Sequence, residues 1–211
     1  MPKRTVTLGV MASGRGTNLQ SILDAIAAGR LDAKIALVLS DREDAQALDR
    51  ARAAGVPARH LNPKAFPSRE AHDAAAADLL RGAGVELVAL AGYMRLITRA
   101  LLDAFPDRII NIHPSLLPAF TGLNAQRQAI EYGVKLAGCT VHFVTEGVDS
   151  GAIILQAAVP VRDDDTEATL AERILAEEHR LLPEALQLYA EGRVSIEGRR
   201  VRIAPPASVG L

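Results

Sequence analysis

The sequence has few of the features that crosslink a protein or draw it to a charged polymer. Cys139 is the only cysteine among 211 residues, so no internal disulfide can form. A lone cysteine fits a reducing compartment, and we expect the cytoplasm. The formal net charge is −1, which indicates neither a nucleic acid nor an anionic membrane as partner. No apolar stretch reaches the roughly 20 residues of a membrane-spanning helix.

Several catalytic motifs are also absent. The chain has no H-E-x-x-H, no paired cysteine ligands and no Ser-His-Asp signature. It has neither a G-x-G-x-x-G loop nor a Walker A lysine loop, so a dinucleotide or a nucleoside triphosphate is not indicated. Asp163, Asp164 and Asp165 could suggest a metal, but a solvated acidic turn before a helix explains them better. We therefore expect no metal site.

The hydrophobic pattern predicts a single α/β domain over residues 1–211. Hydrophobic residues make up 49 % of the chain, enough for a globular core. Up to residue 113, strand and helix patterns alternate, which predicts a Rossmann-like, twisted, mostly parallel sheet with helices on both faces. After Pro118, two strands joined by a short loop predict antiparallel strands added on the C-terminal side, at the sheet edge. The predicted strands are 5–11, 34–40, 58–61, 85–91, 109–113, 139–144 and 152–161; the predicted helices are 19–27, 41–54, 69–81, 98–105, 125–132 and 167–189, followed by a hairpin at 192–203.

The stretch 108–118 carries the strongest chemical signal. Its β-branched apolar residues predict a buried strand that must stop at Pro114, because proline cannot continue a central ladder. Asn111 and His113 are two residues apart, so both side chains leave the same face of that strand. In open α/β sheets ligands bind at the carboxyl ends of the strands. The alternative is a polar pair satisfied by a nearby loop.

A glycine loop at 13–18 follows the first predicted strand and precedes a helix. This layout aims backbone N–H groups and a helix dipole at an anion such as a phosphate. Gly16 allows a tight turn or close approach of a ligand, and Thr17 or Asn18 could cap the helix or bind a phosphate oxygen. The alternative is an ordinary strand-to-helix turn with a good cap.

Asn111, His113 and Asp149 together suit direct acyl transfer. An amide donor and an imidazolium can stabilise an oxyanion at an attacked carbonyl, and a carboxylate can orient the imidazole or pass a proton through water. None of the three is a strong nucleophile, which favours transfer between two bound substrates. On residue type alone, Asp149 could equally be a turn residue, and His142 a structural histidine.

Four motifs carry a family resemblance that covers the chain from Val6 to about Arg193. The chain resembles the folate-dependent formyltransferases and, among them, the phosphoribosylglycinamide formyltransferases of purine synthesis. The motifs are Asn-Ile-His-Pro-Ser-Leu-Leu-Pro at 111–118, Ser-Gly-Arg-Gly-Thr-Asn-Leu-Gln at 13–20, Ala-Gly-Tyr-Met-Arg at 91–95, and Val-His-Phe-Val at 141–144 leading to Asp-Ser-Gly at 149–151.

The resemblance implies transfer of a formyl group from 10-formyltetrahydrofolate, as cosubstrate, to the amine of glycinamide ribonucleotide. It implies small-molecule substrates only, a monomer or homodimer, a ribonucleotide-phosphate half at about 1–105 and a folate and catalytic half at about 106–203. The implied catalytic residues are Asn111, His113 and Asp149. The implied ribonucleotide residues are Gly16, Thr17, Asn18 and Glu178, and the implied folate residues are Arg69, Met94, Arg95, Leu96, Ile97, Asn111 and Val144, with 144–149 enclosing the pteridine.

The chain departs from the family pattern after Pro118, and other activities stay open. Thr121 stands where a proline is usual, and Asn124 replaces a histidine, so the loop is less constrained and one titrating group is lost. Formyltetrahydrofolate deformylase uses the same Asn, His and Asp but carries an extra N-terminal domain, whereas this chain begins directly at the first predicted strand. Methionyl-tRNA formyltransferase needs a C-terminal nucleic-acid-binding domain. A non-catalytic phosphate- or folate-binding module is a further alternative.

Overall fold

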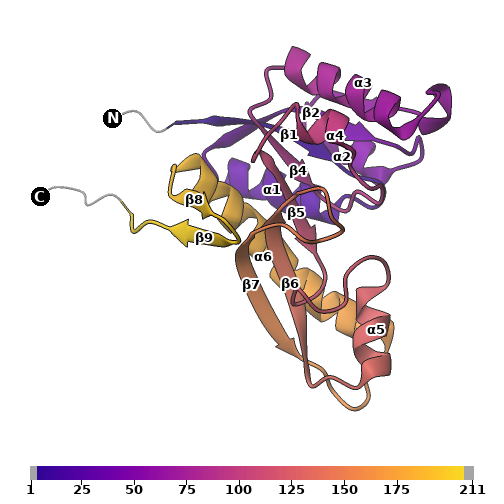
Figure 1. The fold of residues 1–211 in the computed structure, drawn as a ribbon, viewed down its shortest axis with the longest axis vertical. Coiled ribbons are helices and arrows are strands. Elements are labelled where there is room, and N and C mark those ends of the chain that lie inside the picture. Colours follow the sequence, from indigo (N-terminus) through magenta and orange to yellow (C-terminus); the bar gives the residue numbers. More distant parts are fainter. Residues whose placement is uncertain (1–3, 207–211) are drawn as a thin grey trace, which may run out of the picture.

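The computed structural model describes residues 4–206, in which nine strands form one continuous sheet (Figure 1). The strand order is β3-β2-β1-β4-β5-β6-β7-β9-β8. From β3 to β5 all neighbours pair in parallel, whereas β5-β6, β6-β7 and β8-β9 pair antiparallel. The strands are β1 Val6–Met11, β2 Ala33–Ser40, β3 Ala58–His60, β4 Leu87–Leu90, β5 Ile109–His113, β6 Leu136–Phe143, β7 Ile153–Pro160, β8 Val194–Glu197 and β9 Arg200–Ile203.

Helices cover both faces of the sheet, each over its own core (Figure 1). Leu8 and Val10 on β1 face the core that α1, α2 and α6 share, while Met11 faces the core under α3 and α4. This alternation along one strand is the period of two expected where both faces are covered. The helices are α1 Thr17–Ala27, α2 Gln46–Ala53, α3 Arg69–Gly82, α4 Arg99–Leu102, α5 Ala125–Tyr132 and α6 Glu167–Ala190, with a 3-10 turn at Pro63–Ala65.

The predicted fold class is confirmed, including the parallel sheet, the antiparallel additions and the strand end at His113 before Pro114. The additions do not form the sheet edge, however. The terminal hairpin follows β7 through a single parallel pair, Ile153 with Arg200, and leaves β8 at the edge. No helix within residues 4–206 is long and apolar enough to cross a membrane.

Three predicted boundaries are wrong by three residues or more, and one of them is the end of α4, predicted at Phe105 but found at Leu102. The second helix begins at Gln46 rather than residue 41, because the polar side chains before it bond locally: Ser40 accepts from the Arg42 N–H at 3.1 Å, and Arg42 pairs with Asp44 at 2.9 Å. The strand predicted from residue 139 begins at Leu136. Leu136 is 60 % exposed, so hydropathy gives no sign that its backbone is paired with β7.

The strand order creates a topological switch point between β1 and β4. The chain builds outward from β1 to β3, then returns to add β4 and β5 on the other side of β1. Connections leave in opposite directions at such a point, and ligands bind in the crevice that opens there. The glycine loop and the segment 92–98 leave the carboxyl ends of β1 and β4, on the two sides of this switch point. Asn111 and His113 lie at the carboxyl end of β5, the next strand in the sheet.

Candidate active site

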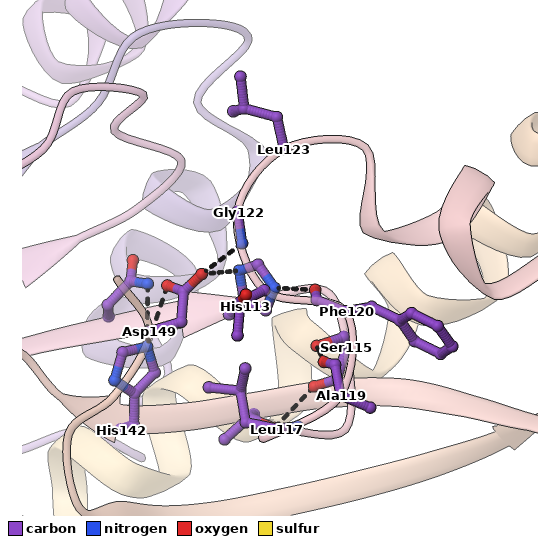
Figure 2. Close-up of polar contacts among 12 residues, drawn as sticks. His113, Ser115, Leu117, Ala119, Phe120, Gly122, Leu123, His142 and Asp149 are labelled. Carbon is purple, nitrogen blue, oxygen red and sulfur yellow. Dashed lines mark hydrogen bonds and ion pairs between the residues drawn. The ribbon is translucent and has the colours of Figure 1, made fainter. Parts of the chain in front are cut away.

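His113 and Asp149 form the centre of the candidate site (Figure 2). His113 Nδ1 lies 3.3 Å from Asp149 Oδ2, and its Nε2 lies 2.9 Å from the Phe120 carbonyl oxygen. Both ring nitrogens therefore face oxygen acceptors, an arrangement that a doubly protonated ring satisfies. The engagement of Nε2 with Phe120 also means that this bond must open before His113 can donate to a substrate oxygen through that nitrogen.

Asp149 is held in the site by the backbone around it. Its φ of 49° is in the left-handed region, which aspartate tolerates better than most residues. Asp149 Oδ2 also accepts a hydrogen bond from the Gly122 N–H at 2.8 Å, which fixes the loop 119–124 against the carboxylate. The loop that departs from the family pattern is thus tied directly to Asp149.

His142 is a member of the site that residue types alone did not reveal. In Figure 2, Asp149 lies between His113 and His142, and the His142 Nε2 is 3.7 Å from Asp149 Oδ1. The β5-β6 register pairs Asn111 with His142 and places both on one face. The sequence did contain one signal: along this strand, polar Thr140 and His142 alternate with apolar Val141 and Phe143, which puts His142 on the polar face.

The tautomer of His142 determines how Asn111 is oriented. Nδ1 of His142 lies 2.8 Å from the Phe143 carbonyl and donates to it, because a carbonyl can only accept. Burial lowers the pKa of His142, against opposing effects of the Phe143 carbonyl and Asp149, so the ring is held neutral. Nε2 then accepts from Asn111 Nδ2 at 3.1 Å, which leaves the second N–H of the Asn111 amide for a ligand.

The turn that follows His113 is braced from the neighbouring strands. Thr140 on β6 donates to the Ser115 carbonyl at 2.6 Å and accepts from the Leu117 N–H at 3.0 Å. Gln156 on β7 donates to the Leu117 carbonyl at 3.0 Å and to Thr140 Oγ1 at 2.9 Å. These bonds fix the point where the chain leaves β5, and with it the position of His113.

The start of α1 differs from the expected cap and suits an anion better. Gly16, at φ 70°, is the N-cap, no side chain caps the helix, and Thr17 is its first residue. Neither Thr17 nor Asn18 therefore caps α1, which leaves the first backbone N–H groups without a side-chain partner. A cavity of about 340 Å³ borders this helix start, lined by Thr17, Gln20, Ser21, Asp24, Arg30, Arg50 and His179.

Asn18 turns instead towards α6, where it meets Glu178. Asn18 Nδ2 donates to Glu178 Oε2 at 2.7 Å, across 160 positions of sequence. Burial raises the pKa of Glu178, and the bond from Asn18 only partly opposes this. Asn18 Oδ1 is buried without a hydrogen-bond partner among the described residues. The pair thus offers an unsatisfied acceptor and a buried carboxyl group to a ligand at the start of α1.

Replacing Glu178 with glutamine should remove a pH-dependent loss of stability. Because the pKa of Glu178 is raised in the folded protein, the folded state binds the proton more tightly than the unfolded state. The contribution of Glu178 to the free energy of unfolding is fully present below the ordinary carboxyl pKa. It is lost as pH rises through the pKa of Glu178 in the folded protein, by about 1.4 kcal/mol for each unit between the ordinary and the folded pKa. Urea unfolding from pH 4 to pH 8 should show wild type losing stability relative to Glu178→Gln over that window; a constant difference would contradict this.

The segment 92–98 after β4 presents apolar side chains near the candidate catalytic triad, which is Asn111, His113 and Asp149. Met94 and Leu96 are 64 % and 53 % exposed. Arg99, at the start of α4, lies 3.7 Å from Glu146, which brings the segment opposite the loop 144–151 that carries Val144 and Asp149. Arg69, the first residue of α3, is exposed, and Asp73 one turn later accepts from the Thr98 N–H at 2.7 Å.

The remaining predicted features lie as follows. Arg95 and Ile97 are half-buried, and Arg95 Nε has no hydrogen-bond partner among the described residues. Burial, followed by the charges of Asp41 and Asp73, raises the pKa of Tyr93.

Within residues 4–206 no three His, Cys, Asp or Glu side chains cluster as a metal site. In the acidic turn at 163–165, Asp165 pairs with Arg173 at 2.8 Å, and Thr166 caps α6.

An amide donor, an imidazole, a carboxylate and an uncapped helix start at one sheet edge define an α/β site suited to acyl transfer to a substrate that carries an anion. Comparison with known sequences narrows this class. The family profile described as Formyl transferase matches residues 6–186, so the chain belongs to the formyl transferase family.

Similar proteins are, by name, phosphoribosylglycinamide formyltransferases, glycinamide ribonucleotide transformylases and purine biosynthetic proteins. The phosphoribosylglycinamide formyltransferase of Haemophilus influenzae is 42 % identical over 90 % of each chain. The crystal structure of glycinamide ribonucleotide transformylase 1 from Symbiobacterium toebii has a TM-score of 0.94 and 64 % identity, and 95 % of each chain is covered. The human trifunctional purine biosynthetic protein adenosine-3 is 44 % identical over 92 % of this chain, which spans only 19 % of that protein's length.

A formyltetrahydrofolate deformylase is a more distant structural relative. The structure from Pseudomonas syringae has a TM-score of 0.88 but 29 % identity, and the match covers 67 % of that chain. The fold is therefore shared between transferases and a hydrolase, while the higher identities belong to the transferases.

Proposed function

We propose that the protein transfers the formyl group of 10-formyltetrahydrofolate to the amine of glycinamide ribonucleotide, a step of purine biosynthesis. The observation that carries the proposal is the contact of His113 Nδ1 with Asp149 Oδ2 at 3.3 Å, on the side of the sheet where Asn111 and the uncapped start of α1 also lie. His113, Asp149 and Asn111 suit attack on a formyl carbon. The uncapped helix start suits the phosphate of the acceptor. The names of the relatives at 42–64 % identity support the same reaction.

In the proposed mechanism the ribonucleotide amine attacks the formyl carbon and forms a C–N bond. The carbonyl oxygen becomes an oxyanion, to which the free N–H of Asn111 donates, joined by His113 once Nε2 leaves the Phe120 carbonyl. The bond from the formyl carbon to the folate nitrogen then breaks. The proton lost by the amine passes to that nitrogen by way of Asp149 and water. No step requires a metal.

The proposed substrate sites lie on the two sides of the triad. The phosphate binds the backbone N–H groups of Gly16, Thr17 and Asn18, and the ribose hydroxyls reach Glu178 and the unsatisfied Asn18 Oδ1. The folate contacts the exposed apolar segment 94–97. Its remaining proposed contacts are Arg69, Arg95, Asn111 and Val144. We propose that the enzyme acts in the cytoplasm, as a monomer or homodimer, on these small molecules and without nucleic acid.

The function is tested by following folate product spectroscopically with and without glycinamide ribonucleotide. A transferase releases tetrahydrofolate only when the ribonucleotide is present, and the formylated ribonucleotide appears in equal amount. Release of tetrahydrofolate and formate without the ribonucleotide would identify a deformylase instead. Binding of both ligands with no turnover would identify a non-catalytic binding module.

Asp149→Asn should lower kcat at least about tenfold, with a much smaller change in the KM for the ribonucleotide. The substitution keeps the shape of the side chain but removes the charge that faces His113, and a hydrogen bond to a charged group contributes at least about 1.5 kcal/mol. Steady-state kinetics across pH provide the measurement. Asp163→Asn, which changes an exposed aspartate paired with Lys135, is the control and should leave kcat unchanged. If Asp149→Asn keeps the wild-type kcat throughout, Asp149 is only a turn residue.

A further inference from the structure

Ser13 lies at the switch point between β1 and β4 and joins the loop after β1 to the segment after β4. Its hydroxyl accepts from the Met94 N–H at 2.9 Å and donates to Asp41 Oδ1 at 2.6 Å, and its own N–H donates to the Gly92 carbonyl at 3.0 Å. Only 4 % of Ser13 is exposed, so water competes little for these bonds. We propose that Ser13 is a positioning residue that couples the ribonucleotide and folate sites, so that binding of one substrate strengthens binding of the other; the inference rests on the proposed function.

The loop on the ribonucleotide side is tied closely enough to transmit a change at the phosphate. The Gly14 carbonyl accepts from the Ala47 N–H at 3.1 Å, and Arg50 Nε donates to the Arg15 carbonyl at 2.8 Å. These bonds hold residues 14 and 15 against α2, while Gly16 is the N-cap of α1. A phosphate that orders the N–H groups of this short loop therefore also restrains Ser13 at its beginning.

In the part of the chain that the structure describes, two side chains from outside the folate-side segment accept hydrogen bonds from its backbone N–H groups. Ser13 fixes it at Met94, and Asp73 fixes it at Thr98. Asp73 is itself buried and lies 3.1 Å from Nδ1 of His72. Between the two anchors lie the exposed side chains of Met94 and Leu96. Only the Ser13 anchor belongs to the ribonucleotide loop, so the two anchors have different consequences when lost.

The two substrate sites are coupled because Ser13 restricts the motion of both loops together. A ligand that restricts one loop reduces the conformational entropy that the other loop still has to lose, so the second ligand binds more tightly. The effect must be reciprocal, because the two orders of binding lead to the same ternary complex. Ser13→Ala leaves the Met94 N–H without its acceptor, so the ribonucleotide loop no longer holds the segment at Met94. Among the described residues, only the backbone bond from the N–H of residue 13 to the Gly92 carbonyl still joins the two loops. Asp73→Asn loosens the same segment at its far end but leaves Ser13 between the loops.

The test measures the affinities of glycinamide ribonucleotide and tetrahydrofolate, a pair that cannot react, by calorimetry without oxygen. In wild type each ligand should tighten the other at least fivefold, a typical lower bound for coupled sites. Ser13→Ala should bind both ligands, but the ratio of the affinity for one ligand with and without the other should fall to about one. Asp73→Asn, the matched control, should weaken tetrahydrofolate but keep the wild-type ratio. Absence of coupling in wild type, or full coupling in Ser13→Ala, overturns the inference.

A second measurement needs no variant. Glycinamide ribonucleotide alone should slow hydrogen exchange at the Met94 amide, although the ribonucleotide site is on the other loop; unchanged exchange at Met94 with the ribonucleotide bound overturns the coupling. Failure of the proposed function gives a different result. A deformylase would bind tetrahydrofolate but not the ribonucleotide, and a non-catalytic module would bind both ligands but give no turnover in the product assay.

Discussion

Asn111→Ala should lower kcat by about 10²–10³, the cost of removing one oxyanion donor. The amide has one N–H engaged with His142 at 3.1 Å, and the other is the donor expected to meet the developing charge. Because that charge exists only after attack on the formyl carbon, the loss falls on kcat rather than on substrate affinity. Steady-state kinetics with both substrates varied measures the two separately.

Asn62→Ala provides the matched control for Asn111→Ala. Asn62 also uses its side chain in a hydrogen bond, accepting from the Lys64 N–H at 3.0 Å, but it caps an exposed turn away from the triad. Its kcat should equal that of wild type. A folded Asn111→Ala enzyme with kcat within threefold of wild type would remove Asn111 from the mechanism.

Gly16→Val should raise the KM for glycinamide ribonucleotide by roughly ten- to a hundredfold. Gly16 has φ 70°, which a β-branched residue rarely adopts, and a Cβ would lie 2.6 Å from Ala47 Cα on α2. Strain of this kind costs on the order of 1–3 kcal/mol, and the loop must move to relieve it, taking the phosphate-binding N–H groups with it. Affinity for the folate should change less.

Gly29→Val separates the effect of backbone strain from the effect on the loop. Gly29 has φ 65°, but a Cβ there would meet nothing within 4 Å, and the residue lies beyond the other end of α1. Both variants should lose stability in thermal unfolding, whereas only Gly16→Val should lose affinity for the ribonucleotide. An unchanged ribonucleotide KM in folded Gly16→Val would contradict the phosphate site.

The local parts of this site are predictable from the sequence because they depend on neighbouring residues. Ile109, Ile110 and Ile112 make β5 a buried strand, Pro114 ends it, and the spacing of Asn111 and His113 puts both on one face. The glycine loop is similarly legible, although the identity of the N-cap is not. Gly16 takes that position because α2 packs directly against it, a tertiary contact that no local pattern contains.

The contacts within the site depend on register and on long-range packing, which hydropathy does not specify. His142 meets Asn111 only because β5 and β6 pair with those two residues opposite each other; a shift of one residue would turn His142 to the other face. Asn18 meets Glu178 because α1 and α6 share one face of the sheet. The family resemblance alone supplied Glu178. Residue chemistry already grouped Asp149 with Asn111 and His113, but left a turn residue as an equal alternative until the resemblance was considered.

The bonds from Phe143 through His142 to Asn111 have a direction, and that direction begins at a main-chain atom. The Phe143 carbonyl can only accept, so His142 must donate to it through Nδ1. Burial favours the neutral ring, in which Nε2 accepts, so Asn111 must present hydrogen rather than oxygen at that point. A carboxylate at position 111 would set an oxygen lone pair against the lone pair of Nε2. The amide at position 111 is therefore selected by a peptide carbonyl that no side-chain substitution can remove.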